Sequence, residues 1–397
     1  METALITGVA GFIGSSLAEK LLKDNFKVIG IDSFTNYYST RIKEKNIENC
    51  LKHPNFSLIH QDLDTLDLSV SIEKAEYFFH LSAQPGVRAS WGKEFTTYVK
   101  NNISVTQKIL ESLKNSTRLK KFVFASSSSV YGNQSSIMNE DTSLTRPASP
   151  YGVTKLAAEN LVNLYFKNYG VPTISLRYFT VYGPRQRPDM AFTRFFHSII
   201  KDNKLIIFGN GEQTRDFTYV DDIVDATINA ATSNYVGEIL NFGGGSVFSL
   251  IQIIEFMKEI TEKELEIDFK TEQKGDVKHT SADISKSEKL INYKSNTDIK
   301  YGLTQQQAAV KLGITQATIS NYKNRSRENI ELYLITKRIE SFANDIAVMI
   351  MKNTNEIEIS EMFETTLQFI RKQNIIYDLH KELESNHNVE KCPICKK

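Results

Sequence analysis

The sequence predicts an α/β protein built on a Rossmann-like, doubly wound parallel sheet. Three observations carry this prediction. Short apolar segments alternate with segments of helical periodicity, as in a sheet whose parallel strands are joined by helices. A glycine-rich loop, Gly8 to Gly14, separates the first apolar segment from the first helical one, and an acidic residue, Asp32, follows the second apolar segment.

The elements follow from the same periodicities. Strands are expected at residues 4–7, 27–31, 56–59, 77–80, 121–125 and 173–176, and helices over 15–23, 103–113 and 156–168. From Met190 onward helix, short strand and loop mix, which suits a smaller α/β lobe over the carboxyl edge of the sheet. We expect a first domain over residues 1–180 and a partly interleaved lobe over 181–301.

The composition excludes several classes of protein. The 397 residues carry a net charge of +1, so nucleic-acid binding would need a local basic patch. Three cysteines, Cys50, Cys392 and Cys395, favour a reducing, cytoplasmic setting. No apolar run reaches the roughly 20 residues of a membrane helix. Glu2 argues against a signal peptide, the rival interpretation of residues 3–18.

The glycine loop is typical of a dinucleotide site. Its glycines let the backbone approach a pyrophosphate, which the N-terminus of the next helix attracts. Asp32 can accept hydrogen bonds from both ribose hydroxyls, and its charge would repel a 2′-phosphate. The loop therefore predicts NAD rather than NADP and makes residues 1–180 an NAD-binding domain; glycines in an ordinary turn are the alternative.

Tyr151 and Lys155 stand one turn apart on an expected helix, with Ser149 suited to its cap and Pro150 to its first position. The helix dipole and Lys155 are expected to lower the pKa of the Tyr151 phenol below its usual value of about 10, as a general base requires. A surface helix that carries this pair by chance is the alternative.

These motifs, with the serine run 126–129, resemble the extended short-chain dehydrogenases/reductases of the NAD-dependent epimerase/dehydratase family. The resemblance spans residues 1–300 and implies that Ser127 holds the reacting sugar oxygen and shares its proton with Tyr151. It makes Ser127, Tyr151 and Lys155 the catalytic residues. The implied cofactor-binding residues are Gly8, Gly11, Phe12, Ile13, Gly14, Asp32, Asp62, Leu63, Leu81, Ala83, Tyr151 and Lys155.

The positions after Ser127 discriminate among reactions of that family. Members similar to dehydratases carry acidic residues there and decarboxylases a glutamate, whereas this chain has Ser128 and Ser129. Elimination and decarboxylation need such an additional acid or base and are therefore disfavoured. Reversible oxidation at C4 of the sugar remains, so the resemblance implies a 4-epimerase that works through a 4-keto intermediate.

Residues 176–191, LRYFTVYGPRQRPDMA, resemble the epimerases of UDP sugars, especially the glucuronate 4-epimerases. In that family a threonine and an arginine at the positions of Thr180 and Arg187 hold the sugar carboxylate; contact of Arg187 with phosphate or solvent is the alternative. UDP-glucose stays open as the substrate, and a homodimer is expected. The implied substrate-binding residues are Arg88, Ser128, Thr180, Arg187 and Arg215.

A different motif begins at Leu303. Residues 303–322, LTQQQAAVKLGITQATISNY, resemble the helix-turn-helix of archaeal transcriptional regulators, with Thr304 as the expected cap of the first helix. Four basic and no acidic residues lie between 303 and 327, which suits DNA phosphates. A plain helical hairpin is the alternative. The predicted base-contacting residues are Gln316, Thr318, Ser320 and Asn321.

Residues 302–327 thus form an expected helix-turn-helix and 328–397 a helical tail, together an all-α extension. The spacing of Cys392 and Cys395 matches half of a four-thiolate zinc site, so a zinc ion that two chains hold together is an expectation. The whole chain can be an epimerase with a DNA-binding module, a regulator that senses a sugar nucleotide, or a fusion product whose helix-turn-helix has no selected role. The complete set of Ser127, Tyr151 and Lys155 favours catalysis.

Overall fold

The computed structural model describes residues 1–312 apart from residues 135 and 245. Its centre is a seven-stranded sheet of order β10-β6-β5-β4-β1-β2-β3, in which every neighbouring pair is parallel. The strands are β1 (Thr3–Thr7), β2 (Lys27–Asp32), β3 (Phe56–His60), β4 (Tyr77–His80), β5 (Lys121–Ser127), β6 (Thr173–Tyr178) and β10 (Glu238–Phe242). The Rossmann-like prediction and its six strands are confirmed, and β10 adds a seventh from beyond residue 180.

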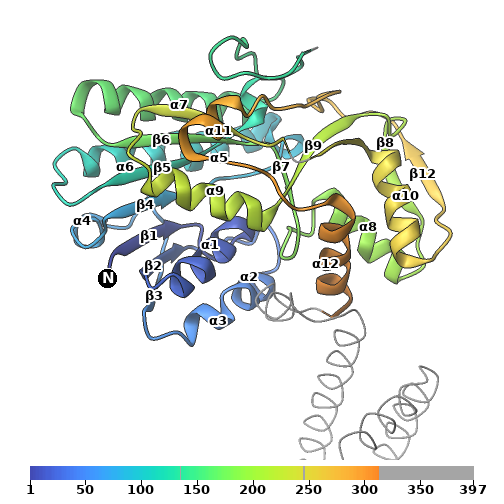
Figure 1. Cartoon of the computed structure of the whole chain (residues 1–397), viewed down its shortest axis with the longest axis horizontal. Coiled ribbons are helices and arrows are strands. Elements are labelled where there is room, and N and C mark those ends of the chain that lie inside the picture. The colour runs from blue at the N-terminus through green and yellow to red at the C-terminus, as the bar shows by residue number, and fades with distance from the viewer. Residues whose placement is uncertain (135, 245, 313–397) are drawn as a thin grey trace, which may run out of the picture. The chain divides into compact units, whose positions relative to one another are not determined.

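Two helical layers cover this sheet, because successive side chains of each strand point to opposite faces. Ala4 and Ile6 of β1 belong to the apolar cluster that includes α1 (Phe12–Lys23) and α9 (Val220–Thr232). Leu5 belongs to the opposite cluster, with α6 (Val105–Leu113) and α7 (Pro150–Tyr169). Figure 1 shows these helices around the labelled strands. Shorter helices are α2 (Thr40–Asn46), α3 (Glu48–Leu51), α4 (Ser69–Ile72), α5 (Phe95–Tyr98) and a π-helical turn, Val99–Ser104.

The remaining elements form two smaller sheets and four helices. A three-stranded sheet has the order β11-β9-β7, and a two-stranded sheet pairs β12 with β8. The strands are β7 (Thr180–Tyr182), β8 (Leu205–Phe208), β9 (Thr214–Tyr219), β11 (Ser246–Ser249) and β12 (Ile267–Lys270); the helices are α8 (Ala191–Ile200), α10 (Leu250–Thr261), α11 (Ser285–Ile291) and α12 (Ile299–Leu312).

Helix α12 corrects part of the helix-turn-helix prediction. Asp298, not Thr304, caps it, by accepting hydrogen bonds from the backbone N–H groups of Lys300 and Tyr301 at 2.9 and 3.2 Å. Thr304 lies inside the helix and donates to the carbonyl of Lys300. The helix packs against α8 and α10, beside which Figure 1 shows it. The apolar stripe of this helix therefore packs on the α/β unit, and the second helix of the predicted pair lies outside the described residues.

The other predictions for the extension concern residues outside the described part of the chain. These are the base-contacting residues Gln316, Thr318, Ser320 and Asn321, and the cysteines Cys392 and Cys395. None of the helices in the described part is long and apolar enough to cross a membrane.

Candidate active site

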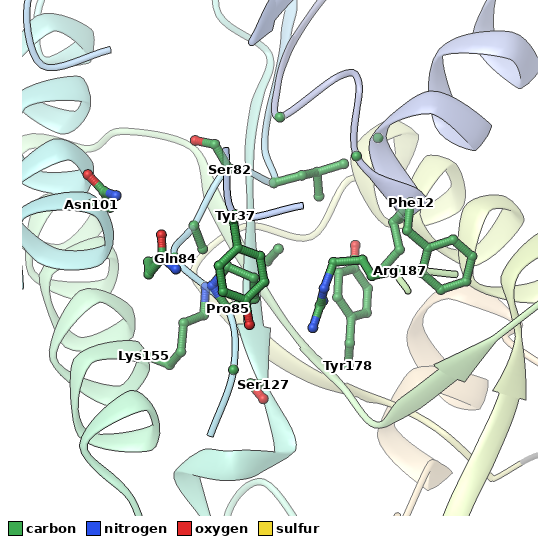
Figure 2. A pocket seen from close by; sticks show the side chains of 18 of the residues that line it. Phe12, Tyr37, Ser82, Gln84, Pro85, Asn101, Ser127, Lys155, Tyr178 and Arg187 are labelled. Atoms are coloured by element: carbon green, nitrogen blue, oxygen red, sulfur yellow. The ribbon is translucent and has the colours of Figure 1, made fainter. Parts of the chain in front are cut away.

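A cavity of about 480 Å³ opens beside the carboxyl ends of the parallel strands, the edge where open α/β sheets bind ligands. The glycine loop, the ends of β2, β4 and β5, and the start of α7 line it. Figure 2 shows Phe12, Ser127, Lys155 and Arg187 around this cavity. The cavity thus brings the predicted cofactor loop and the predicted catalytic residues together.

The glycine loop fits a dinucleotide pyrophosphate. A Cβ atom at Gly14 would lie 2.2 Å from the carbonyl oxygen of Gly8, and one at Gly8 would lie 2.9 Å from the Cα of Ser82. Gly8 also has φ = 72°, a left-handed conformation that favours glycine. The positions of Gly8 and Gly14 therefore have no room for a side chain, and the loop presents its backbone at the start of α1, as a bound diphosphate requires.

The Asp32 carboxylate is held at the end of β2. It accepts hydrogen bonds from the backbone N–H groups of Ala10 (3.0 Å) and Phe34 (2.8 Å). It lines the cavity, so the position fits its predicted contact with a ribose. All the other predicted cofactor-binding residues also line the cavity: Gly8, Gly11, Phe12, Ile13, Gly14, Asp62, Leu63, Leu81, Ala83, Tyr151 and Lys155.

His80 immediately precedes this lining but is built into the core. Its ring is hydrogen-bonded to the hydroxyls of Thr7 (2.8 Å) and Thr106 (3.1 Å). Burial lowers the pKa of His80 to about 3, so the ring is neutral. His80 is therefore a buried structural residue next to the cavity lining.

Ser127, Tyr151 and Lys155 meet at the junction of β5 and α7. Ser149 caps α7 by accepting a hydrogen bond from the Gly152 N–H at 3.1 Å, and Pro150 occupies the first turn, as predicted. The Ser127 Oγ accepts a hydrogen bond from the Ser129 N–H at 3.2 Å. Its own proton therefore remains available for its hydrogen bond to the Tyr151 phenol.

The prediction that the pKa of Tyr151 is lowered is wrong. Burial raises that pKa, and the Ser127 hydrogen bond and the positive charge of Arg187 offset only part of the increase. The pKa of Lys155 falls to about 8, because burial of its ammonium group outweighs the attraction of Glu159. The sequence could indicate the helix dipole and the neighbouring lysine, but not how deeply both groups are buried.

A buried polar network supports this junction. The Glu159 carboxylate, one turn beyond Lys155 on α7, accepts a hydrogen bond from Ser126 at 2.6 Å and two from Arg177 at 3.0 and 2.6 Å. Arg177 also donates to the Tyr131 hydroxyl at 2.8 Å. The network ties α7 to β5 and β6 beside Ser127. This network could not be predicted from the sequence, because its members are distant in the chain.

Three of the predicted substrate-binding residues, Ser128, Thr180 and Arg187, line the cavity. Arg88 and Arg215 lie outside this lining. Arg88 forms an ion pair with Asp276 at 2.6 Å, and Asp276 and Arg88 both act electrostatically on Arg215. The structure therefore separates the predicted substrate contacts into a group inside the cavity and a group around Asp276.

The loop after β2 contributes residues that the sequence analysis missed. Tyr37 and Tyr38 line the cavity with Lys43, and the Tyr37 hydroxyl donates to Asp189 at 3.4 Å. Two consecutive aromatic residues closely following Asp32 were the available signal. Over the described part of the chain, no group of three or more His, Cys, Asp or Glu side chains could hold a metal ion.

Comparisons with known proteins agree with this geometry. Residues 4–243 match the model of the NAD-dependent epimerase/dehydratase family. The uncharacterised UDP-glucose epimerase YtcB of Bacillus subtilis is 44% identical over 306 residues, which cover 77% of this chain and 96% of that protein. The UDP-glucuronate 4-epimerase of Thermodesulfobacterium geofontis is 39% identical over 332 residues, 83% of this chain and 97% of that protein.

A solved structure of similar fold is the UDP-glucuronic acid 4-epimerase from Bacillus cereus in complex with UDP-glucuronic acid and NAD. It is 44% identical, has a TM-score of 0.76, and the match covers 78% of this chain and 99% of that one. The family match extends over more than half of the chain and the relatives are covered almost completely. The chain therefore belongs to the NAD-dependent epimerase/dehydratase family.

Proposed function

We propose that this protein is an NAD-dependent UDP-sugar 4-epimerase and that its substrate is UDP-glucuronate. The observation that carries the proposal is that one cavity is lined both by Ser127, Tyr151 and Lys155 and by Thr180 and Arg187. The first set suits proton transfer at a sugar hydroxyl, and the second suits a sugar carboxylate. The named activities of the relatives support the same assignment.

In this proposal Tyr151 is the general base that removes the proton from the C4 hydroxyl. Ser127, whose Oγ is oriented by the Ser129 N–H, donates a hydrogen bond to the reacting oxygen or to the Tyr151 phenolate. The positive charge of Lys155 stabilises that phenolate. NAD, when bound along the glycine loop, supplies a hydride acceptor for C4 and afterwards a donor to the opposite face of the 4-keto sugar.

The serines after Ser127 support epimerisation over the other reactions of the family. Ser128 and Ser129 provide no carboxyl group for eliminating water or carbon dioxide. A hydroxyl at Ser128, which lines the cavity, can hydrogen-bond the sugar without further proton transfer. The keto sugar is therefore reduced again rather than converted further.

The proposal is tested by incubating the purified full-length protein with NAD and either UDP-glucuronate or UDP-glucose, and separating the products by chromatography. We expect conversion of UDP-glucuronate to UDP-galacturonate, and much slower conversion of the neutral sugar. A protein that converts only UDP-glucose contradicts the substrate, and one that converts neither contradicts the enzyme class.

A homodimer is proposed as the working form. Val153 and Leu164 on α7 expose apolar side chains to solvent, and a second copy could cover them. Light scattering of the native protein against a Val153→Glu/Leu164→Glu variant tests this: loss of a dimer in the variant supports the interface, and a monomeric native protein contradicts it. DNA binding by residues 316–321 stays a prediction, tested by gel shift of the full chain.

A further inference from the structure

Arg187 and Asp189 form an ion pair at the cavity. The Nε and Nη2 groups of Arg187 each donate a hydrogen bond of 3.0 Å to a different oxygen of Asp189. The Arg187 side chain is 22% exposed and that of Asp189 is 40% exposed. Arg187 lines the cavity, whereas Asp189 does not. The carboxylate thus holds the guanidinium from outside the cavity.

Asp189 binds one edge of the Arg187 guanidinium and makes no hydrogen bond to the other edge. Asp189 occupies the edge formed by Nε and Nη2, while the edge formed by Nη1 and the second Nη2 proton lies outside this pair. Within the described residues the structure gives Nη1 no hydrogen-bond acceptor. A guanidinium has five N–H donors in a fixed plane, so one carboxylate on the first edge leaves room for another on the second.

Tyr37 is a second hydrogen-bond partner of the Asp189 carboxylate. Its hydroxyl donates to the Oδ2 of Asp189 at 3.4 Å, and Figure 2 shows the Tyr37 and Arg187 side chains together in the cavity. The loop after β2 and the segment before α8 therefore meet at the Asp189 carboxylate. Asp189 is fixed by two partners that both reach into the cavity, although it does not line the cavity itself.

We propose that Asp189 is a positioning residue for substrate selection, which holds the outer edge of Arg187 so that the other edge faces a sugar carboxylate. This inference rests on the proposed function, because it concerns the uronate class of substrate. Asp189 acts only through Arg187. A neutral hexose offers no carboxylate to that edge, so its binding should depend little on Asp189.

The experiment compares Asp189→Asn with the native full-length enzyme. Asparagine keeps the shape but replaces one acceptor oxygen by an NH₂ group, which cannot accept from the guanidinium. We expect the KM for UDP-glucuronate to rise about ten-fold or more, with kcat within about two-fold and the Kd for UDP-glucose unchanged. Asp189→Glu, which retains both oxygens, should recover most of the loss.

Two controls separate positioning from a general effect. Glu266→Gln removes a carboxylate from an exposed ion pair with Lys204 at 2.9 Å and should leave both substrates unaffected. In an Arg187→Lys background, Asp189→Asn should change the KM for UDP-glucuronate no further, because a lysine ammonium has no second planar edge to orient.

Two results overturn the inference. Equal weakening of both sugars would make Asp189 merely structural. A lower KM for UDP-glucuronate in Asp189→Asn would mean that Asp189 competes with the substrate for Arg187. Native enzyme that binds UDP-glucose but neither binds nor converts UDP-glucuronate overturns the proposed substrate itself, a failure visible before any variant is made.

Discussion

Replacing Glu159 by leucine would leave Arg177 as an unpaired cation in the interior. The two side chains are 2% and 4% exposed and their closest atoms lie 2.6 Å apart. Removing one partner of a buried ion pair costs about 3–5 kcal/mol, because the other charge stays desolvated. The melting temperature should therefore fall by roughly 5–15 °C. Activity should fall as well, because Glu159 also holds Ser126 beside the proposed catalytic Ser127.

A double-mutant cycle measures whether the pair is the cause. Glu159→Leu, Arg177→Met and the double variant are unfolded thermally and in urea, with Glu266→Gln as the exposed control. The double variant removes both charges, so its loss of stability should be smaller than the sum of the single losses by about 2 kcal/mol or more. Additive losses, or a Glu159→Leu variant as stable as the control, would refute the role given to the network.

The remaining predictions concern the cofactor loop, the last helix and the catalytic lysine. Gly14→Ala should weaken NAD binding, measured by calorimetry, by up to roughly 100-fold. The added Cβ would lie 2.2 Å from the Gly8 carbonyl oxygen, and accommodating it costs about 1–3 kcal/mol. Unchanged NAD affinity would contradict the pyrophosphate site assigned to this loop. Gln306→Leu should lower the free energy of unfolding in urea by about 1–3 kcal/mol, because Gln306 is 1% exposed and accepts a hydrogen bond from the Gly183 N–H at 3.2 Å. Thr304→Ala, at an exposed position of the same helix, should lower it less. Equal losses would argue against the packing of α12 on the α/β unit. Lys155→Met should be more stable than the native protein at pH 7 by roughly 3 kcal/mol, because the pKa of Lys155 is about 8 in the folded protein against an ordinary 10.5. Between pH 8 and 10.5 the unfolded chain therefore binds more protons than the folded protein, and the stability of the native protein rises with pH over about this range. The stability difference between Lys155→Met and the native protein should shrink accordingly. A stability difference that does not change with pH would contradict a buried ammonium group at Lys155.

The central sheet could be predicted because buried parallel strands are short apolar runs in the sequence. The glycine loop, Asp32 and the Tyr151–Lys155 spacing could be predicted because each motif is local in the chain. The Glu159–Arg177 pair could not, since it joins α7 to β6, nor could the contact of Tyr37 with Asp189. These pairs depend on tertiary packing that neither spacing nor composition encodes.

Helix α12 illustrates a second limit of sequence patterns. The periodic small and apolar positions around Leu303 and Ala309 indicate a buried helix face but not the surface that covers it. In the structure both residues are buried in a helix that packs on α8 and α10. The same pattern therefore suits the last helix of an α/β enzyme as well as the first helix of a DNA-binding pair.

In the proposed function, Tyr151 transfers the proton in a C4 epimerisation of a UDP-hexuronate. The most direct test is turnover of UDP-glucuronate by the native enzyme and by Tyr151→Phe, each with NAD and substrate binding measured by calorimetry. We expect the native enzyme to form the 4-epimer, and the variant to bind both ligands while losing at least about 100-fold in kcat. A variant that retains native turnover, or a native enzyme inactive on this substrate, would contradict the claim.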